Sequence, residues 1–226
     1  MPPGIRAENR AEVTRAILER ASSQLAEVGP SALSVRQIAR ELEMASSAVY
    51  RYFPSRDALL TALLIAAFDA VGEAAEAGAA RGGTLRARFS RASHAVRDWA
   101  RAHPHEYALA YGSPVPGYVA PTDTIASYTR VVAVLMGIVR DAQVDDRPLG
   151  APVRDISGKE RKALAPVSQF TEPALDDAHT TRGLVVWATL FGHLSLELFG
   201  HMHNGVLDYD EHFRTVVEQL ADDLGL

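Results

Sequence analysis

The sequence of 226 residues contains no cysteine, which excludes a disulfide framework and any metal site built on thiolates. The opening residues Met1–Arg6 lack the apolar core of a signal peptide, and no apolar run approaches the roughly 20 residues that span a bilayer. Stability must therefore come from packing, and a reducing compartment is compatible with this composition. We expect a cytoplasmic protein with no membrane partner.

The chain also lacks a net positive charge, because 28 acidic side chains exceed 23 basic ones. A net charge of -5 counts against a nucleic-acid partner, since phosphate binding usually rests on lysine and arginine. The distribution weakens that objection, because residues 1–56 carry eight arginines against six acids, whereas residues 57–226 carry 15 basic against 22 acidic side chains. Fields decay over roughly 8 Å at physiological salt, so a basic N-terminal face can meet DNA while the acidic remainder is screened.

Strand signals are missing as well. No alternating run of β-branched residues is bounded by hairpin turns, and the apolar residues of every long segment recur at helical spacing. The sequence predicts an all-α fold of two unequal domains. Helices are expected near residues 9–28, 35–42, 46–52, 56–68, 84–101, 122–142, 159–170, 176–200 and 208–224, with a further short helix opened by Pro104. The polar segment 143–158 is expected to be a long loop or partly disordered.

Three short helices within the first 56 residues match the geometry of a helix-turn-helix, in which a tight turn separates the second helix from the third. The turn is expected at Glu43–Ala45. The second helix begins as a capping box, in which Ser34 accepts a hydrogen bond from the third amide and Gln37 reaches back to the cap. The sequence therefore predicts an N-terminal DNA reader whose third helix lies in the major groove.

The third helix has one apolar face, formed by Ala48, Val49 and Phe53, and an outer face of small and polar residues. Small serines allow close approach to base edges, tyrosine hydroxyls donate to phosphates, and arginine pairs with guanine or phosphate. The capped start of the second helix also directs free N–H groups toward the DNA backbone. The DNA contacts predicted on these grounds are Ser34, Arg36, Ser46, Ser47, Tyr50, Arg51 and Tyr52. The alternative is a three-helix piece of a larger bundle, in which both tyrosines are partly buried core.

The runs Ser34–Leu42 and Ala48–Leu60 closely resemble the TetR family of regulators, and the resemblance covers about Asn9 to Ala70. It implies an all-helical, dimeric protein. It also implies DNA contacts at the position of Tyr50, at the position before Phe53, and by a basic residue at the position of Arg56.

Three positions depart from the pattern of that family. Glu43 stands where the turn usually has glycine, Ala45 replaces a frequent capping serine, and Tyr52 replaces the usual histidine. A turn without glycine is tolerable, so these departures bear on the operator sequence rather than on the function.

The segment Trp187–Leu198 is apolar nearly all round the helix, which implies burial on more than one side. A partner chain is the natural cover, and the segment together with the last helix resembles the two-helix dimer interface of TetR regulators. The predicted interface residues are Ala188, Gly192, Ser195, Phe213, Val217 and Leu220. The same segment also resembles effector domains marked by a Trp-His-Gly motif, with Phe191 in place of the histidine. The alternative is that both helices only complete the core of one chain.

Aromatic and methionine side chains on several helices can line an apolar cavity for an unknown small apolar effector. The predicted pocket residues are Phe68, Trp99, Tyr107, Tyr111, Tyr128, Met136, Phe170, Trp187 and Phe191. The alternative for each of them is an ordinary core position.

Metal binding and catalysis find little support in the sequence. His103 with His105, and His201 with His203, are two residues apart and so point to different faces of a helix. Ser195 is near a histidine but lacks the Gly-x-Ser-x-Gly elbow of a nucleophile. We expect no metal and no cofactor, and an enzyme is the least expected class.

The hypothesis from the sequence is a ligand-responsive repressor that binds a pseudo-palindromic operator as a homodimer and releases it when an effector changes the spacing of the two readers. The expected organisation is a flexible tail over residues 1–8, a helix-turn-helix domain over 9–56 that extends to about 70 by the family's definition, and an effector-binding and dimerisation domain over 57–226. The alternatives are a helical small-molecule-binding protein or enzyme that no longer reads DNA, a transcription activator without ligand-triggered release, and a nucleoid-type architectural protein.

Overall fold

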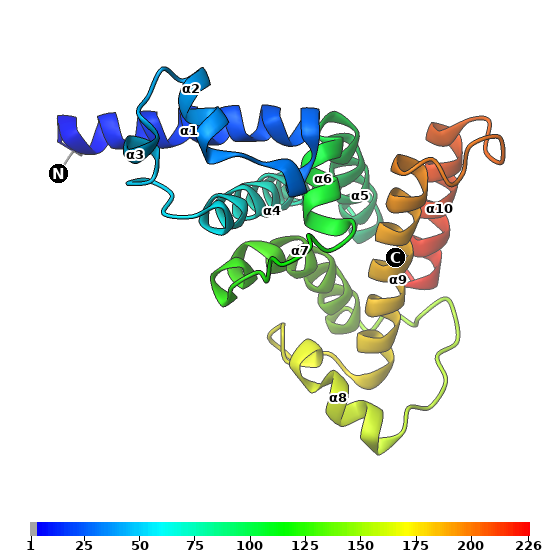
Figure 1. Ribbon diagram of the computed structural model, residues 1–226. Helices are drawn as coiled ribbons and strands as arrows, with labels where there is room; N and C mark the ends of the chain where they lie inside the picture. Colours follow the sequence, from blue (N-terminus) through cyan, green and yellow to red (C-terminus); the bar gives the residue numbers. More distant parts are fainter. Residues whose placement is uncertain (1–3) are drawn as a thin grey trace. The chain divides into compact units, whose positions relative to one another are not determined.

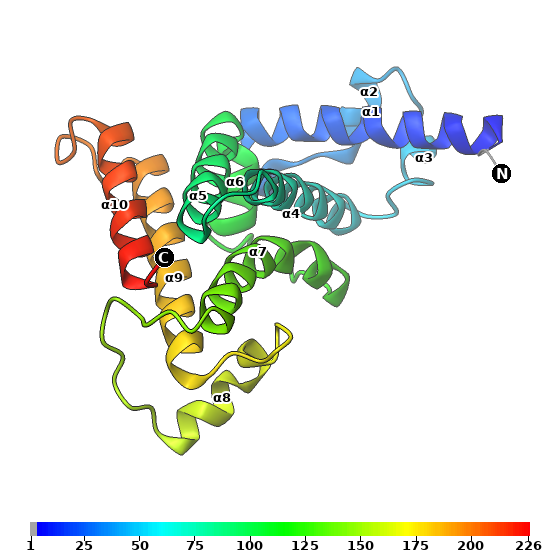
Figure 2. The same ribbon diagram turned by 180° about the vertical axis from the view of Figure 1, so that it is seen from behind.

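The computed structural model describes residues 4–226, and over this range the chain is helical, without strands (Figures 1 and 2). The predicted all-α fold is confirmed. The elements in chain order are α1 Ile5–Val28, the 3₁₀ turn η1 Pro30–Ala32, α2 Val35–Glu41, α3 Ser46–Val49, α4 Arg56–Ala80, α5 Leu85–Ala102, α6 Pro104–Tyr111, the 3₁₀ turn η2 Thr122–Thr124, α7 Ile125–Val144, α8 Gly158–Ser168, α9 Asp177–Leu198 and α10 Tyr209–Asp223.

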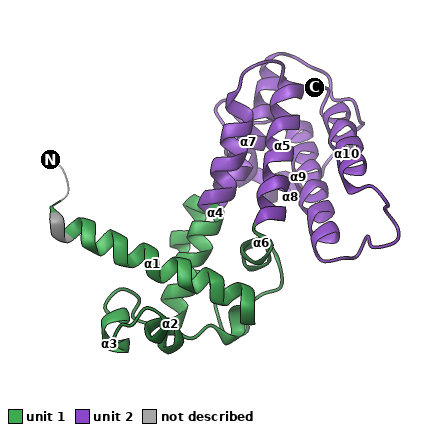
Figure 3. Cartoon of the chain, turned by 90° about the horizontal axis from the view of Figure 1, so that it is seen from above, with its two compact units in different colours: residues 1–68, 103–127 green, residues 69–102, 128–226 purple. Residues whose placement is uncertain are grey.

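The chain forms two compact units (Figure 3). Unit 1 consists of the described residues up to Phe68 together with His103–Ser127, and unit 2 consists of Asp69–Ala102 and Tyr128–Leu226. Helix α4 therefore contributes its first half to unit 1 and its second half to unit 2.

Helix α1 begins at Ile5 rather than near residue 9. Gly4 has an extended backbone, and its carbonyl accepts hydrogen bonds from the amides of Ala7 at 2.7 Å and Glu8 at 3.2 Å. The first turn is thus closed by backbone bonds alone, without a side-chain cap. Residues 5–8, half of the expected flexible tail, are helical, and its first three residues lie outside the described part of the chain.

Of the two hydrogen bonds predicted for the cap of α2, one is confirmed and the other is wrong. The Ser34 hydroxyl oxygen accepts a hydrogen bond from the Gln37 amide at 3.3 Å. The Ser34 amide, however, donates to the side-chain oxygen of the fully buried Gln24 at 2.6 Å, and the Gln37 side chain instead donates to Glu41. A residue of α1 therefore takes the place that the local motif assigns to Gln37.

Unit 1 is built around one apolar core to which α1, α2, α3 and the first half of α4 all contribute. Its fully buried members include Ile17, Ile38, Val49 and Leu60. The loop before η2 adds Val115 to the same core. Helices α1, α2 and α3 are therefore held together by one shared core.

Unit 2 packs α5, α9 and α10 against one another, and α9 and α10 run side by side in both ribbon views (Figures 1 and 2). Helix α8 packs on α9 but buries none of its own residues. The polar segment after α7 is a long loop, tied to the end of α10 by a bond from the Ala151 amide to the Asp223 carbonyl and to α9 by Arg182, which donates to the Pro152 carbonyl. Of the two alternatives for this segment, the structure shows the loop.

Two stretches, Arg56–Ala80 and Thr122–Val144, are long and apolar enough to cross a membrane by length and composition. Core helices of soluble proteins pass the same test, and 50% and 39% of their most apolar windows are buried.

Candidate nucleic-acid interface

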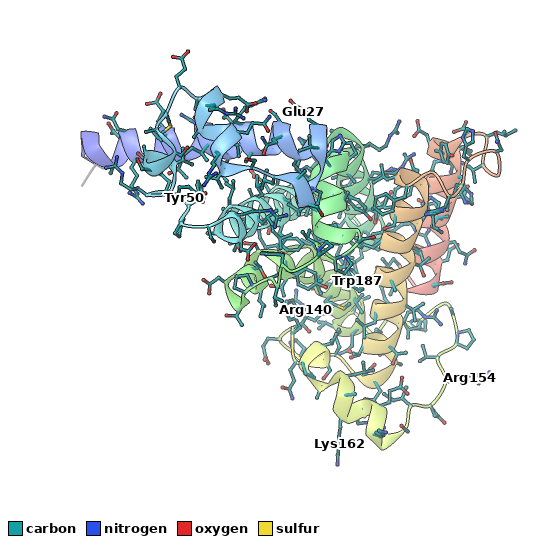
Figure 4. All side chains as sticks on the ribbon, viewed as in Figure 1. Glu27, Tyr50, Arg140, Arg154, Lys162 and Trp187 are labelled. Atoms are coloured by element: carbon teal, nitrogen blue, oxygen red, sulfur yellow. The ribbon has the colours of Figure 1, made fainter. Side chains whose placement is uncertain are left out.

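Helix α3 presents two distinct faces, as its sequence predicts. Val49 and Phe53 are buried in the core of unit 1. Ser47 and Arg51 are exposed, Ser46 is half-buried, and Tyr50 is 40% exposed, on the outer surface of unit 1 in Figure 4. After α3 the chain continues in tight turns, in which Phe53 donates to the Val49 carbonyl at 3.0 Å. These turns keep the outward residues in a helical arrangement past the end of α3.

The turn that leads into α3 is held in a left-handed conformation at Glu43, whose φ is +54°. Glycine is the residue that adopts this conformation without a steric penalty. The amide of Met44 donates to the Ala39 carbonyl at 2.8 Å, which closes the turn on the end of α2. The glutamate is accommodated here at some cost in backbone energy.

Tyr52 lies differently from Tyr50, because its half-buried side chain packs against the core of unit 1. The guanidinium carbon of Arg10 lies 5.1 Å from the centre of the Tyr52 ring, within the range of a cation–π contact. The predicted phosphate contact of Tyr52 stays a prediction, while its ring positions a cation that the motif does not include.

Arg10 is thus a candidate DNA contact that the sequence reasoning missed. A signal for it exists, because Arg10 continues the α1 stripe of Val13, Ile17 and Ala21 by one further step of three residues. Since that stripe packs on the core that carries α3, its outward extension lies beside the reader.

Two arginines of the reader are held by internal partners. Arg20 donates from Nε to Glu41 Oε2 at 2.5 Å, which links α1 to α2 and, with a bond from Gln37, lowers the pKa of Glu41 to about 2. Arg56 donates from Nη2 to the Pro30 carbonyl at 2.5 Å. The DNA contact predicted for Arg56 therefore competes with a bond that fixes the start of α4.

Five other arginines of unit 1 are exposed and have no carboxylate within 4.0 Å among the described residues. They are Arg10 and Arg15 on α1, Arg36 and Arg40 on α2, and Arg51 just after α3. Unpaired guanidinium groups can pair with phosphate without first breaking an ion pair. Ser34 is half-buried, and its side chain already caps α2. Of the two predicted phosphate contacts at the start of α2, Arg36 is therefore the one with an exposed side chain.

The structure does not gather the nine predicted pocket residues in one cavity. Inside unit 1, Tyr111 contacts both Phe68, edge to face at 5.7 Å between ring centres, and Tyr107, in a tilted pair at 5.2 Å. In unit 2, Met136 and Phe191 are core residues, and Trp99 borders a separate surface hollow between α4 and α5. The remaining three, Tyr128, Phe170 and Trp187, line one slot between α7, α8 and α9.

The predicted dimer interface needs a correction. Phe213 and Val217 are 0% exposed and Leu220 is 5% exposed within the single chain, so these α10 residues belong to the core of unit 2 and have no surface to offer a partner. Ala188 and Gly192 on α9 are exposed, and Ser195 is half-buried.

The prediction also missed the larger apolar residues of α9. Val185, Leu196 and Phe199 are 46%, 45% and 42% exposed, and with Ala188 and Gly192 they form a stripe at steps of three and four residues, which we call the α9 stripe. Nothing lies within 4 Å of the place where Gly192 would carry a Cβ. An apolar stripe of this length on a surface helix marks an interaction site.

Comparison with known proteins gives consistent matches along the whole chain. A family model described as "Bacterial regulatory proteins, tetR family" matches residues 17–63, and one described as "Tetracyclin repressor-like, C-terminal domain" matches residues 89–220. The "HTH-type transcriptional regulator Rv1816" of Mycobacterium tuberculosis strain H37Rv is 37% identical over 97% of both chains.

Solved structures agree with this result. The "putative regulatory protein SCO4313" is 32% identical, covers 94% of this chain and 97% of its own, and superposes with a TM-score of 0.78. A Rhodococcus protein described as being of unknown function is 27% identical over 94% of this chain and 95% of its own, with a TM-score of 0.70. The likeness therefore includes both the reader and the larger helical unit.

Proposed function

This chain belongs to the TetR family of bacterial regulatory proteins and is a DNA-binding transcriptional regulator, and on that premise we propose that it is a ligand-responsive repressor that binds a pseudo-palindromic operator as a homodimer. Ligand response and dimerisation are typical of the family. Its members are soluble bacterial regulators, and we place the chain in the cytoplasm.

The observation that supports the reading of DNA is the division of α3 into two faces. Val49 and Phe53 fix the helix on the core, while Tyr50 and Arg51 point outward. A recognition helix needs this arrangement, because its outer side chains must reach base edges in the major groove while its inner face stays packed. Arg51 is the side chain best suited to guanine, since its guanidinium matches the two acceptors of that base.

The unpaired arginines give this face its phosphate contacts. Arg10 and Arg36 come from α1 and α2, the two helices that precede the recognition helix in the chain. In the proposed complex they bind the DNA backbone and fix the register of α3, while Tyr50 and Arg51 supply the sequence preference.

The α9 stripe supports the homodimer. Its exposed apolar residues, Val185, Leu196 and Phe199, follow one side of a helix of 22 residues. Pairing of this stripe with its copy around a two-fold axis buries apolar surface on both chains, and Gly192 leaves room for the second helix to approach. Two readers on one dimer then meet half-sites spaced by about one helical turn of DNA.

Selection of bound sequences from random DNA tests the reading function. The wild-type chain should enrich a two-fold symmetric sequence. On that sequence, Tyr50→Phe with Arg51→Ala should weaken retention at least about 30-fold, since each base contact contributes roughly 1–3 kcal/mol and two protomers lose it. Arg81→Ala, which removes an exposed arginine of unit 2, is the matched control and should retain wild-type affinity. Undiminished sequence-specific binding by the double variant overturns the assignment of the reader.

Sedimentation velocity tests the dimer. Leu196→Glu places a charge in the α9 stripe and should convert the dimer to monomers, while circular dichroism shows unchanged helix content. Ala26→Glu introduces the same charge at an exposed position of α1 and should leave the dimer intact. A dimer that survives Leu196→Glu rules out the α9 stripe as its interface.

A further inference from the structure

We propose that the slot between α7, α8 and α9 in unit 2 binds a small uncharged aromatic molecule of about two fused rings. The inference gives a place and a chemical class to the effector, and it rests on the proposed function only for the consequence on DNA binding. Figure 4 shows Trp187 on the side of α9 that faces α7.

The slot has three walls from separate helices. Tyr128 and Val132 come from α7, Val167 from α8, and Leu184 and Trp187 from α9. The space between them is about 250 Å³. Phe170, which follows α8, completes the lining. A concave site with aromatic walls on three elements is the usual form of a site for small molecules.

The lining selects an uncharged ligand. No aspartate, glutamate, lysine or arginine side chain borders the slot. A charged group that entered it would lose its hydration without gaining a group of opposite charge, which is a large cost. The polar groups of the lining side chains are the hydroxyls of Tyr128 and Thr129 and the indole N–H of Trp187. Burial raises the pKa of Tyr128, so this hydroxyl stays neutral at physiological pH.

The size of the slot limits the ligand to about two rings. Benzene fits an apolar cavity of roughly 150 Å³, so 250 Å³ accommodates on the order of ten carbon atoms. Trp187 is held by the neighbouring Phe191, with ring centres 5.6 Å apart and planes inclined by 40°. A fixed indole face on one side favours a flat aromatic ligand in offset stacking.

Helix α8 is the wall that can respond to the ligand. It buries none of its residues, and its Lys162 points away from the body of unit 2 (Figure 4). An ion pair of 2.5 Å from Arg161 to Asp177 ties it to the start of α9. A ligand in the slot adds apolar contacts to Val167 and so stabilises the docked position of α8.

The slot is separate from the dimer surface. On a helix of 3.6 residues per turn, Leu184 and Trp187 lie about a third of a turn around α9 from the α9 stripe. The partner chain of the proposed dimer therefore meets a different side of the helix. This leaves the slot to a small molecule rather than to a side chain of the second copy.

Calorimetric titration of the full chain with 2-naphthol and 2-naphthoate tests the class of ligand, because the two probes share their ring system and differ in charge at pH 7. The expected result is saturable binding of 2-naphthol and at least tenfold weaker binding of 2-naphthoate. Val132→Trp fills the slot and should abolish binding of 2-naphthol. Ala133→Trp adds the same bulk at the neighbouring exposed position and should leave it unchanged.

Equal binding of both probes, or binding that survives in Val132→Trp, overturns the inference. Loss of 2-naphthol binding in the monomers that Leu196→Glu produces also overturns it, because the binding site would then depend on the dimer contact. Retention of the selected DNA is measured on the same proteins. Absence of sequence-specific DNA binding by the ligand-free wild-type chain refutes the proposed function and leaves the slot result standing, so the two failures are distinguishable.

Discussion

Removal of the Arg10 guanidinium should change how strongly DNA binding depends on salt. This guanidinium lies 5.1 Å from the centre of the Tyr52 ring, beside the recognition helix. Each protein cation that neutralises a phosphate contributes about 0.9 to the slope of log affinity against log salt concentration. A dimer loses two such contacts in Arg10→Gln, so the slope should become shallower by about 1.8. The fold should tolerate the change, because an exposed cation–π contact contributes only roughly 0.5–1 kcal/mol.

Arg15→Gln is the matched control for this measurement. It removes the same charge from the same helix, but Arg15 lies on a part of the α1 surface that it shares with Glu8 and Glu12. Fluorescence anisotropy of the selected duplex, titrated at several KCl concentrations, gives the slope for each protein. We expect the wild-type slope for Arg15→Gln. Equal slopes for the two variants would refute the contact between Arg10 and a phosphate. The effect of Arg10→Gln would then come only from the change in net charge.

Three further predictions concern the folded chain. Arg97 and Glu197 are a pair with side chains only 3% and 7% exposed, so Arg97→Met should lower the free energy of unfolding by about 3–5 kcal/mol in urea titrations at fixed protein concentration, and a second change, Glu197→Leu, should restore most of it. Because Glu43 has a left-handed backbone, Glu43→Gly should raise the free energy of unfolding by about 0.5–1 kcal/mol. A decrease would show that the turn is not strained. Burial, and then the charge of His212, lower the pKa of His193 below its ordinary 6.5. The unfolded chain therefore binds this proton more readily, so stability should fall as the pH is lowered from about 7 to about 5, and His193→Gln should flatten that slope.

The reader was predictable where its structure depends on residues three or four positions apart. The bond from the Gln37 amide to Ser34 and the burial of Val49 and Phe53 both follow from such local spacing. The reciprocal bond of the capping box fails because Gln24, ten residues earlier on α1, is buried beside the Ser34 amide. A partner supplied by the packing of another helix leaves no trace in a motif of four residues.

The interface of unit 2 shows a different limit. Apolar side chains that face the chain's own core and those that face a partner are chemically alike, so composition cannot separate them. The number of apolar stripes on a helix does separate the two kinds. Helix α10 has one apolar stripe, which includes Phe213 and Val217, and this stripe is buried in the core of unit 2. Helix α9 has a second stripe with Val185 and Leu196, which its own chain does not cover.

The second half of α4 is tied to α7, the helix that forms one wall of the proposed ligand site. The first half of α4 contributes Leu60 to the core of unit 1. Its second half is held by Arg130 of α7, which donates to both carboxylate oxygens of Glu76 at 2.9 and 2.7 Å and to the side chain of Asp69 at 3.1 Å. Gly72 permits this close approach, because a Cβ there would lie 2.7 Å from the Cβ of Arg130. Since α7 also forms one wall of the slot, a ligand that shifts α7 should act on the second half of α4 through this charged clamp.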